Sequence, residues 1–389
     1  MTDDVVVLGS GYAGTGAVQR LEEELDGEAD LTWISAVDHH LVLHESHRCI
    51  RDPSLKDRIT FPIADIKSPS TRFVQARVES VDTDDREITL EDDSTVSYDY
   101  LLIGIGSRTA FFGIDGLREH SLTLKTLQDA LDIHDAVTEA AREASRSDPA
   151  QVIVGGAGLS GIQTAGEIAE FRDTHRAPID IHLVEGLDNV FPNSDPVLQA
   201  KLRKLLQSAD IEIHTGEFIG EVDEDTVYVG EDTEMPHDVL IWTGGITGQD
   251  AAERTDVDRD DRSNRIHATS TFQTSDERVF AIGDAAMIEQ PDGEVAPPTA
   301  QAAWQAAEVA GENIARAVRG QPLEEWSHED KGTLVSVGEE AVAHNVIGFR
   351  AFSNTFGGPA AKQLKKVVAA RWIKDVAGPG AAAKAYPDM

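Results

Sequence analysis

The pattern of apolar and polar positions has the same order in two parts of the chain. An apolar run at residues 5–8 leads into a glycine-rich turn at residues 9–14, after which apolar residues recur every fourth position from Ala17, as on one face of a helix. The same order of apolar run, glycine turn and amphipathic segment returns at residues 151–169. Two such units so far apart indicate a duplicated domain rather than a short-period repeat.

Each unit continues into an alternating segment that predicts antiparallel strands. Apolar and polar residues alternate at 72–90 and at 211–235, and each segment is followed by a buried strand that runs into glycines, at 100–107 and 239–245. Farther on, the pattern predicts a strand at 279–282, a long helix at 299–318, a strand at 333–337 and a loose end at 377–389. The fold class that follows is α/β, with two Rossmann-like units and a C-terminal segment.

Both glycine turns have the spacing Gly-x-Gly-x-x-Gly between a strand and a helix, which is the arrangement that holds the pyrophosphate of a dinucleotide. The glycines permit a tight turn and a close approach of the backbone, and the helix N-terminus offers free N–H groups to the phosphates. The glycines concerned are Gly9, Gly11 and Gly14 in the first unit and Gly156, Gly158 and Gly161 in the second. Two ordinary glycine turns are the alternative, which the repeated context disfavours.

The residue after the second strand of each unit predicts which ribose is held. In the second unit this residue is Glu185, whose carboxylate would accept hydrogen bonds from the ribose hydroxyls and repel a 2′-phosphate, so NADH is favoured over NADPH. In the first unit it is Ser35, with Asp38 three residues later. Ser35 departs from the expected acid, but its hydroxyl can still make a hydrogen bond.

The charge of the chain disfavours one class of partner. The 34 Lys+Arg and 70 Asp+Glu residues give a formal net charge of −36, which repels nucleic acid. The acids are spread along the chain, as in salt-adapted proteins, although an ordinary acidic cytosolic protein is the alternative. No apolar run is long enough for a transmembrane helix, and the N-terminus lacks the basic start of a signal peptide.

The single cysteine, Cys49, excludes an intrachain disulfide and a cysteine zinc cluster. It follows the histidines His39, His40, His44 and His47. We interpret Cys49 as a packed side chain, with a reactive single thiol as the alternative. Four histidines could bind a metal ion, but we predict no metal site.

Two dinucleotide-binding units in one chain imply FAD together with a nicotinamide. The sequence here resembles the flavoprotein oxidoreductases with two dinucleotide-binding domains, of the pyridine nucleotide-disulfide oxidoreductase type. Residues 274–284 resemble the second FAD motif of that family, and the turns at 106–107 and 243–245 resemble its strand-to-glycine turns between the domains. The resemblance implies FAD contacts by Gly9, Gly11, Gly14, Ser35, Gly106, Gly283, Asp284 and Ala302, and NADH contacts by Gly156, Gly158, Gly161, Glu185 and Gly244.

The same resemblance implies an order of domains. An FAD-binding domain would comprise residues 1–115 and 261–325, interrupted by an NADH-binding domain at 116–260. A C-terminal segment would follow at 326–389.

Within that family the chain most resembles the type II NADH dehydrogenases, which are single-chain NADH:quinone oxidoreductases. Residues 300–305 are similar to their AQxAxQ quinone-site helix, and residues 331–338 are similar to their KGxxAxxG segment. This implies roles at the reaction centre for Gln301, Gln305 and Lys331, with the helix N-terminus directed at the flavin. The second glycine motif is usually followed by Gly-Val-Glu, whereas this chain has Gln163, which can orient a carbonyl but cannot carry a proton.

Residues 340–389 carry seven basic and three acidic residues, which reverses the charge balance of the rest of the chain. On a helical wheel Leu364, Val368 and Trp372 share one face, although Lys365 and Arg371 intrude on it. Together with the resemblance, this predicts a tail that attaches to a lipid surface, and a peripheral location on the cytoplasmic face of the cell membrane. A solvated terminal helix is the alternative.

The favoured function is therefore oxidation of NADH through FAD, with electron transfer to a membrane quinone and no proton pumping, by a chain that could form a homodimer. One alternative is a soluble NADH-dependent reductase of a small redox protein such as a ferredoxin. Another is a non-enzymatic flavoprotein whose redox state governs the binding of a partner.

Overall fold

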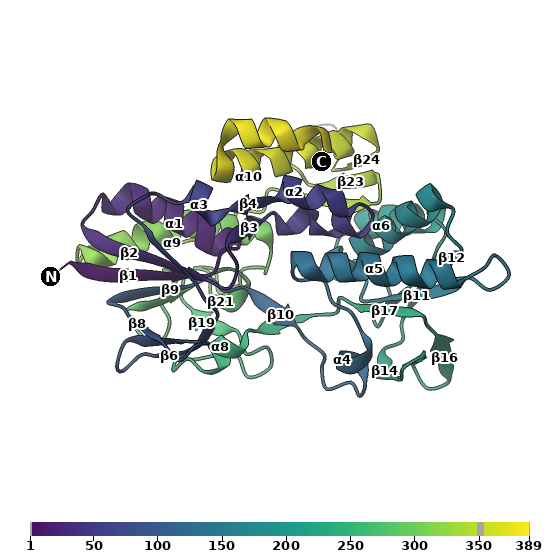
Figure 1. Cartoon of the computed structure of the whole chain (residues 1–389), viewed down its shortest axis with the longest axis horizontal. Helices are drawn as coiled ribbons and strands as arrows, with labels where there is room; N and C mark the ends of the chain where they lie inside the picture. The colour runs from purple at the N-terminus through teal and green to yellow at the C-terminus, as the bar shows by residue number, and fades with distance from the viewer. Residues whose placement is uncertain (1, 348–353, 389) are drawn as a thin grey trace.

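Two parallel sheets form the centres of two units that lie side by side (Figure 1). The computed structural model describes residues 2–347 and 354–388. The first sheet has the strand order β20-β9-β1-β2-β5 and is parallel throughout. Its strands are β1 (Asp3–Leu8), β2 (Ala29–Ser35), β5 (Arg72–Gln75), β9 (Tyr100–Ile103) and β20 (Val279–Ala281).

The second sheet has the order β13-β12-β11-β17, also parallel. Its strands are β11 (Ala150–Gly155), β12 (Ile179–Glu185), β13 (Ile211–Thr215) and β17 (Val239–Trp242). β11 is buried at nearly every position, as expected for the centre of a parallel sheet that is covered on both faces. The duplicated α/β organisation expected from the sequence is thus confirmed.

Helices follow the glycine turns and cover the sheets. α1 (Tyr12–Leu25) packs along α9 (Ala300–Val318) so closely that a Cβ atom at Gly16 would lie 2.8 Å from the Cβ atom of Ala307. The second unit has α5 (Leu127–Glu143), α6 (Leu159–His175) and α7 (Pro196–Ser208). α5 begins with a capping box, in which Thr126 and Asp129 each bind the backbone N–H of the other.

Antiparallel strands complete each unit, as the alternating segments predict. The first unit carries β6 (Val78–Asp82), β7 (Glu87–Leu90) and β8 (Thr95–Ser97), and the second carries β14 (Ile219–Val222), β15 (Thr226–Val229) and β16 (Thr233–Pro236). Short elements connect these layers: β3 (His39–Leu41), η1 (Leu43–Ile50), η2 (Pro53–Leu55), α2 (Lys56–Ile59), β4 (Thr60–Pro62), α3 (Ile63–Ile66), α4 (Leu117–His120), β19 (Ile266–Ala268), η3 (Gly283–Ala285) and β21 (Ala286–Ile288).

The two units are joined by a pair of short antiparallel strands. β10 (Ser107–Thr109) leads out of the first unit and pairs with β18 (Ile246–Gly248), which leads back to it (Figure 1). The next element, α8 (Asp250–Glu253), already contacts β6 of the first unit. The pairing of β10 with β18 therefore joins the two units just beyond the carboxyl ends of β9 and β17.

The C-terminal segment packs on both units. β22 (Thr333–Val337), β23 (Glu340–His344) and β24 (Thr355–Gly357) form an antiparallel sheet, followed by α10 (Pro359–Ala385) and η4 (Tyr386–Asp388). A Cβ atom at Gly166 in α6 would lie 2.4 Å from the backbone nitrogen of Gly338, so α6 lies directly on this sheet. The loose end expected after residue 377 is wrong, because α10 continues past a break at Gly378, where φ is 84°.

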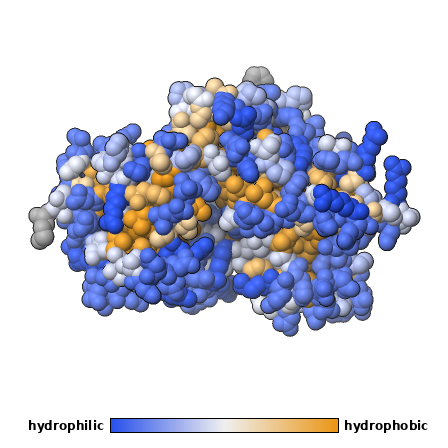
Figure 2. Space-filling view, viewed as in Figure 1, coloured by the Kyte–Doolittle hydropathy of each residue, from blue (hydrophilic) through white to orange (hydrophobic). Residues whose placement is uncertain are grey.

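α10 uses part of its apolar face for packing inside the protein. Trp372 is fully buried against Tyr12, His40 and Trp304, whereas Val367 and Val368 are exposed. The single apolar face predicted for this helix is thus divided between the core and the surface. Figure 2 shows a largely hydrophilic surface, with apolar residues gathered where the C-terminal segment meets the two units. Within the described part of the chain, none of the helices combines the length and the apolarity that a membrane crossing requires.

Candidate active site

The first glycine loop has two glycines packed against backbone and one that faces open space. A Cβ atom at Gly9 would lie 2.4 Å from the carbonyl oxygen of Gly104, and one at Gly14 would lie 2.0 Å from the carbonyl oxygen of Gly9. Gly11, between them, would meet nothing within 4 Å. The outer glycines therefore permit the turn and its packing on β9, and the middle one leaves room for a phosphate at the start of α1.

The second glycine loop repeats this geometry. A Cβ atom at Gly156 would lie 3.0 Å from the Cα atom of Gly244, and one at Gly161 would lie 1.8 Å from the carbonyl oxygen of Gly156. Gly158 again would meet nothing within 4 Å. Gly244 thus acts as the packing partner of this loop. The repetition of all three environments indicates that both loops are built for the same kind of ligand.

Glu185 and Ser35 occupy equivalent places at the ends of β12 and β2, and each ties its strand to the neighbouring glycine loop. The Glu185 carboxylate accepts hydrogen bonds from the N–H groups of Ala157, at 2.8 Å, and Leu187, at 3.0 Å. The buried Ser35 hydroxyl bonds the Ser10 hydroxyl at 2.8 Å. Ser10 and Ala157 occupy the same position in the two motifs. The neutral hydrogen bond of Ser35 to Ser10 therefore holds the first loop where Glu185 holds the second with its carboxylate.

A cleft of about 460 Å³ runs along the first unit and passes the loop at Gly11. It is lined at one end by Ser35 and Arg77, and at the other by Asp284, Ala300 and Ala303. Its volume lies within the range of cofactor sites. The open middle glycine, the helix N-terminus and the residues that line this cleft fit an FAD molecule, with the pyrophosphate at Gly11.

A chain of polar side chains stands at the inner end of the cleft. The Ser107 hydroxyl donates to the Asp284 carboxylate at 3.2 Å, and the Lys125 ammonium donates to the Ser107 oxygen at 3.1 Å. Burial lowers the pKa of Lys125, against the opposing effect of Asp284. Gly106 and Gly283 also line the cleft beside this chain. Sequence reasoning found Asp284 but missed Lys125, because no motif surrounds Lys125 and only the fold brings it here.

The N-terminus of α9 borders the same end of the cleft. Thr299 caps the helix by accepting the N–H of Ala302 at 3.1 Å. Ala300 and Ala303 line the cleft, whereas Ala302 is buried and is not among the lining residues. The positive end of the helix dipole therefore borders the cleft through Ala300 and Ala303 rather than through Ala302.

Gln301 and Gln305 hold a loop of the chain. Gln301 bonds the backbone of Lys331 and Gly332, at 2.8 Å and 3.2 Å. Gln305 exchanges two hydrogen bonds with the backbone of Glu329, at 2.9 Å and 3.0 Å. The structure places the Lys331 side chain half exposed beside Glu329, and Lys331 is not among the residues that line the cleft.

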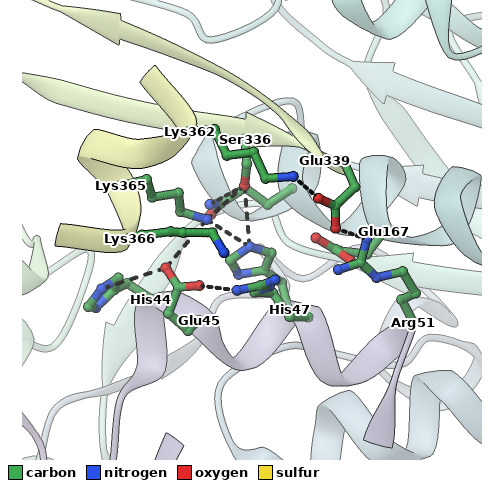
Figure 3. Close-up of polar contacts among 12 residues, drawn as sticks. His44, Glu45, His47, Arg51, Glu167, Ser336, Glu339, Lys362, Lys365 and Lys366 are labelled. Atoms are coloured by element: carbon green, nitrogen blue, oxygen red, sulfur yellow. Dashed lines mark hydrogen bonds and ion pairs between the residues drawn. The ribbon is translucent and has the colours of Figure 1, made fainter. Parts of the chain in front are cut away.

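A buried polar cluster lies between η1, α6, β22 and α10 (Figure 3). Ser336 on β22 is its centre, and its hydroxyl oxygen accepts from the Lys365 ammonium at 2.8 Å and from the Gln163 amide at 3.2 Å. The ring of His47 lies 3.2 Å from the Lys365 nitrogen. The Glu45 carboxylate, which is almost fully buried, lies 3.5 Å from that nitrogen. The cluster brings Gln163 together with Lys365, the intruding lysine of the predicted tail.

Burial and charge divide the carboxyl groups of this region into two kinds. Burial alone would raise the pKa of Glu45, but Lys365, His44 and Arg48 together lower it below its ordinary value. Glu167, one helical turn beyond Gln163, is fully buried, and this raises its pKa to about 7 although Arg51 lies 3.3 Å away. In this cluster Glu45 is therefore a buried carboxylate, whereas Glu167 is a buried carboxyl group with a pKa near neutral pH.

η1 connects the polar cluster to the cleft. Leu43, at the start of η1, lines the cleft, and so does Tyr12, whose hydroxyl bonds the Nδ1 atom of His44. Cys49 is buried at the other end of η1, where burial and Asp52 raise the pKa of its thiol to about 12. Such a thiol is protonated and unreactive at neutral pH, which agrees with its interpretation as a packed side chain.

The histidines of the N-terminal cluster have separate roles. His40 accepts the indole N–H of Trp372 at 2.8 Å and bonds the carbonyl oxygen of Ser10 at 2.8 Å, so both ring nitrogens are used. Burial lowers the pKa of His40 to about 4. His47 instead faces Lys365. These rings are committed to packing and to hydrogen bonds within the protein.

Comparisons with known proteins find relatives that match nearly the whole chain. A type II NADH:quinone oxidoreductase from Staphylococcus aureus is 25% identical over 403 residues, which cover 98% of this chain and 97% of that protein. The structure of NDH2 from Plasmodium falciparum in complex with NADH has a TM-score of 0.86 at 16% identity, covering 100% of this chain and 98% of that one. The sulfide:quinone oxidoreductase from Aquifex aeolicus has a TM-score of 0.79 at 18% identity, covering 97% and 92%.

These solved structures share the fold of this chain. A family model described as pyridine nucleotide-disulphide oxidoreductase matches residues 3–307, which is most of the sequence. The chain belongs to the pyridine nucleotide-disulphide oxidoreductase family.

Proposed function

We propose that this protein oxidises NADH through FAD and passes the electrons to a membrane quinone without pumping protons. The observation that carries the proposal is the matched pair of glycine loops, with Gly11 and Gly158 both open to a phosphate, in units joined directly by β10 and β18. The likeness to the Staphylococcus aureus NADH:quinone oxidoreductase along nearly the whole chain supports the quinone as acceptor.

The residues of the first unit would hold FAD along the cleft. Gly11 and the start of α1 would bind its pyrophosphate, while Ser35 would serve the adenine ribose and Asp284, with Lys125, the ribityl end. When bound, FAD supplies the chemistry that accepts a hydride from NADH and releases electrons singly or in pairs. The N-terminus of α9 would stabilise negative charge that develops at this end of the cleft.

Glu185 would select NADH in the second unit. Each of its oxygens already accepts one backbone N–H and retains a lone pair, so the carboxylate can accept a ribose hydroxyl without moving. The same fixed negative charge would repel the 2′-phosphate of NADPH.

Lys365 would supply the cation at the acceptor side. Gln163 cannot carry a proton, but its amide meets the Lys365 ammonium at the shared Ser336 hydroxyl. Neither lysine lines the cleft, but Lys365 is buried in the cluster next to η1 whereas Lys331 is half exposed, so we assign to Lys365 the role that the sequence suggested for Lys331. Gln301 and Gln305 would act by fixing the loop at residues 329–332.

α10 would attach the protein to the cytoplasmic face of a membrane. Val367 and Val368 are exposed, and so are Arg371 and Lys374 beside them. Lys365 is buried, and Lys362 is paired with Glu339. Replacing both valines by aspartate should prevent co-flotation with anionic vesicles and leave flavin content unchanged. Co-flotation of the double variant at the wild-type level would refute this attachment. The homodimer remains a sequence prediction, which sedimentation of the purified protein would test.

The decisive experiment is steady-state turnover of NADH in molar salt with three acceptors offered separately: a menaquinone analogue, a ferredoxin and oxygen. We expect the quinone to give the highest kcat/KM. Faster reduction of the ferredoxin would favour the soluble-reductase alternative, and tight FAD with negligible turnover on every acceptor would favour a non-enzymatic role.

A further inference from the structure

Three side chains that do not line the cleft converge on one point at the edge of the second sheet. β12 and β13 pair in parallel with His182 opposite Glu212 and Val184 opposite His214. Because side chains alternate along a strand, His182, Glu212 and His214 extend from the same face. The Nδ1 atom of His182 lies 3.3 Å from the Nε2 atom of His214, and the two carboxylate oxygens of Glu212 lie 3.6 Å and 3.5 Å from these nitrogens.

These separations match the ligand spacing around a small metal ion. With metal–nitrogen distances of about 2.0–2.1 Å in a tetrahedron, neighbouring ligand atoms are about 3.3 Å apart. The two nitrogens are 3.3 Å apart, and each has a different oxygen of Glu212 at 3.5 Å or 3.6 Å, so the carboxylate lies where one of its oxygens or both could bind an ion held by the two rings. Among the residues that the structure describes, these three side chains form the group of possible metal ligands whose binding atoms all lie within 4.8 Å of one another.

The hydrogen bonds around His182 determine which ring nitrogen faces the group. Gln151 donates from its amide nitrogen to the carbonyl oxygen of Pro149 at 2.9 Å and to Asp180 at 3.3 Å. Its amide oxygen therefore faces the Nε2 atom of His182, at 2.9 Å, so that Nε2 must carry the proton. The lone pair of Nδ1 is then directed at His214 and Glu212. A hydrogen-bonded outer partner of this kind is typical of histidines that bind metals.

We propose that His182, His214 and Glu212 form a binding site for a divalent transition metal ion such as Zn²⁺, with a water molecule in the remaining position. Two imidazoles and one carboxylate are ligands that suit zinc, cobalt and nickel rather than magnesium or calcium. Water has access to the site, since the Glu212 side chain is 64% exposed and that of His214 is 31% exposed. The ion would join the edge strand β13 to β12, and the inference is independent of the proposed reaction.

The test is titration of the purified, untagged protein with Co²⁺ in molar NaCl and excess Mg²⁺, which suppress loose binding to the acidic surface. We expect one Co²⁺ per chain, with the visible absorption of a tetrahedral or five-coordinate site. His214→Ala should weaken binding at least 100-fold, and Gln151→Leu should weaken it about 10–100-fold by releasing the His182 ring. His267→Ala, which removes an exposed histidine of the first unit, is the matched control and should bind as the wild type does.

Two results would overturn the proposal. One is the absence of stoichiometric Co²⁺ binding under these conditions. The short distance between the His182 and His214 rings would then reflect a hydrogen bond between them rather than a metal site. The other is equal affinity in the His214→Ala and His267→Ala variants, which would locate the ion elsewhere. Circular dichroism of each variant separates loss of the site from loss of the fold.

Discussion

The buried pair of Lys365 and Glu45 allows a quantitative prediction about the attachment of α10. Lys365→Met keeps most of the apolar stem and removes the charge. The ammonium and carboxylate are 3.5 Å apart, with side chains only 13% and 3% exposed. At an effective dielectric constant of about 20, their attraction is about 5 kcal/mol. Arg48 also lies 3.4 Å from the carboxylate and would compensate part of the loss.

We therefore expect Lys365→Met to lower the free energy of unfolding by about 3 kcal/mol, at the lower end of the range for broken buried pairs. With an unfolding entropy of about 2.1 cal/mol/K per residue, a chain of 389 residues shifts by about 1.2 °C per kcal/mol, so this is a fall of roughly 4 °C in Tm. In a Glu45→Gln background the same change should cost less than about 1 kcal/mol, because no uncompensated carboxylate remains. Lys374→Met, on the exposed side of α10, is the control and should change stability by no more than about 0.5 kcal/mol.

The assay is thermal unfolding of all four variants and the wild type, followed by circular dichroism at low and at molar salt. A buried pair is screened little, so the difference between backgrounds should persist in molar salt. An equal cost of Lys365→Met in both backgrounds, or a difference that disappears with salt, would show that the pair does not fasten α10.

Four further expectations concern the two units and the cluster. Glu185→Arg should shift the ratio of kcat/KM from NADH towards NADPH, and an unchanged ratio would remove Glu185 from the ribose. Glu167→Gln should flatten the pH dependence of stability: the folded-state pKa of Glu167, about 7, lies above the ordinary 4.5, so its contribution is fully present below pH 4.5 and is lost as the pH rises through 7. Wild-type Tm should fall over this window, and an identical fall in the variant would contradict the assignment. Gln305→Leu should loosen the loop at Glu329 and slow quinone reduction, with stopped-flow reduction of FAD by NADH nearly unchanged; equal loss of both half-reactions would mean that Gln305 only supports the flavin. Asp284→Ala should yield protein with little bound flavin, whereas Cys49→Ser should retain flavin and activity, and an inactive Cys49→Ser variant would contradict the buried, protonated thiol.

The features that the sequence predicted well are those whose physical cause is local. A strand, a glycine turn and a helix are contiguous, so the turns that contain Gly11 and Gly158 could be inferred from spacing alone, and so could Thr299 as the start of a helix. The loose end after residue 377 was a wrong prediction, because Gly378 and Pro379 interrupt α10 without ending it.

The features that the sequence could not predict depend on pairing between distant segments. Lys125 is linked to Asp284 only through the hydroxyl of Ser107, at the start of β10. Lys365 meets Gln163 only through a strand of the C-terminal sheet. His182 and His214 converge because two strands some thirty positions apart have one register rather than another.

The position of α10 has a consequence for synthesis of the chain. Trp372 fills a space beside Tyr12, and the Gln19 amide donates to the carbonyl oxygen of Val376 at 3.2 Å. At 5–20 residues per second, a ribosome needs roughly 20–70 s to proceed from Tyr12 and Gln19 to these partners. During that interval the nascent chain holds Tyr12 without Trp372 and Glu45 without Lys365. We expect chaperones that recognise apolar segments to bind nascent chains arrested before residue 359, and to release chains extended through residue 385.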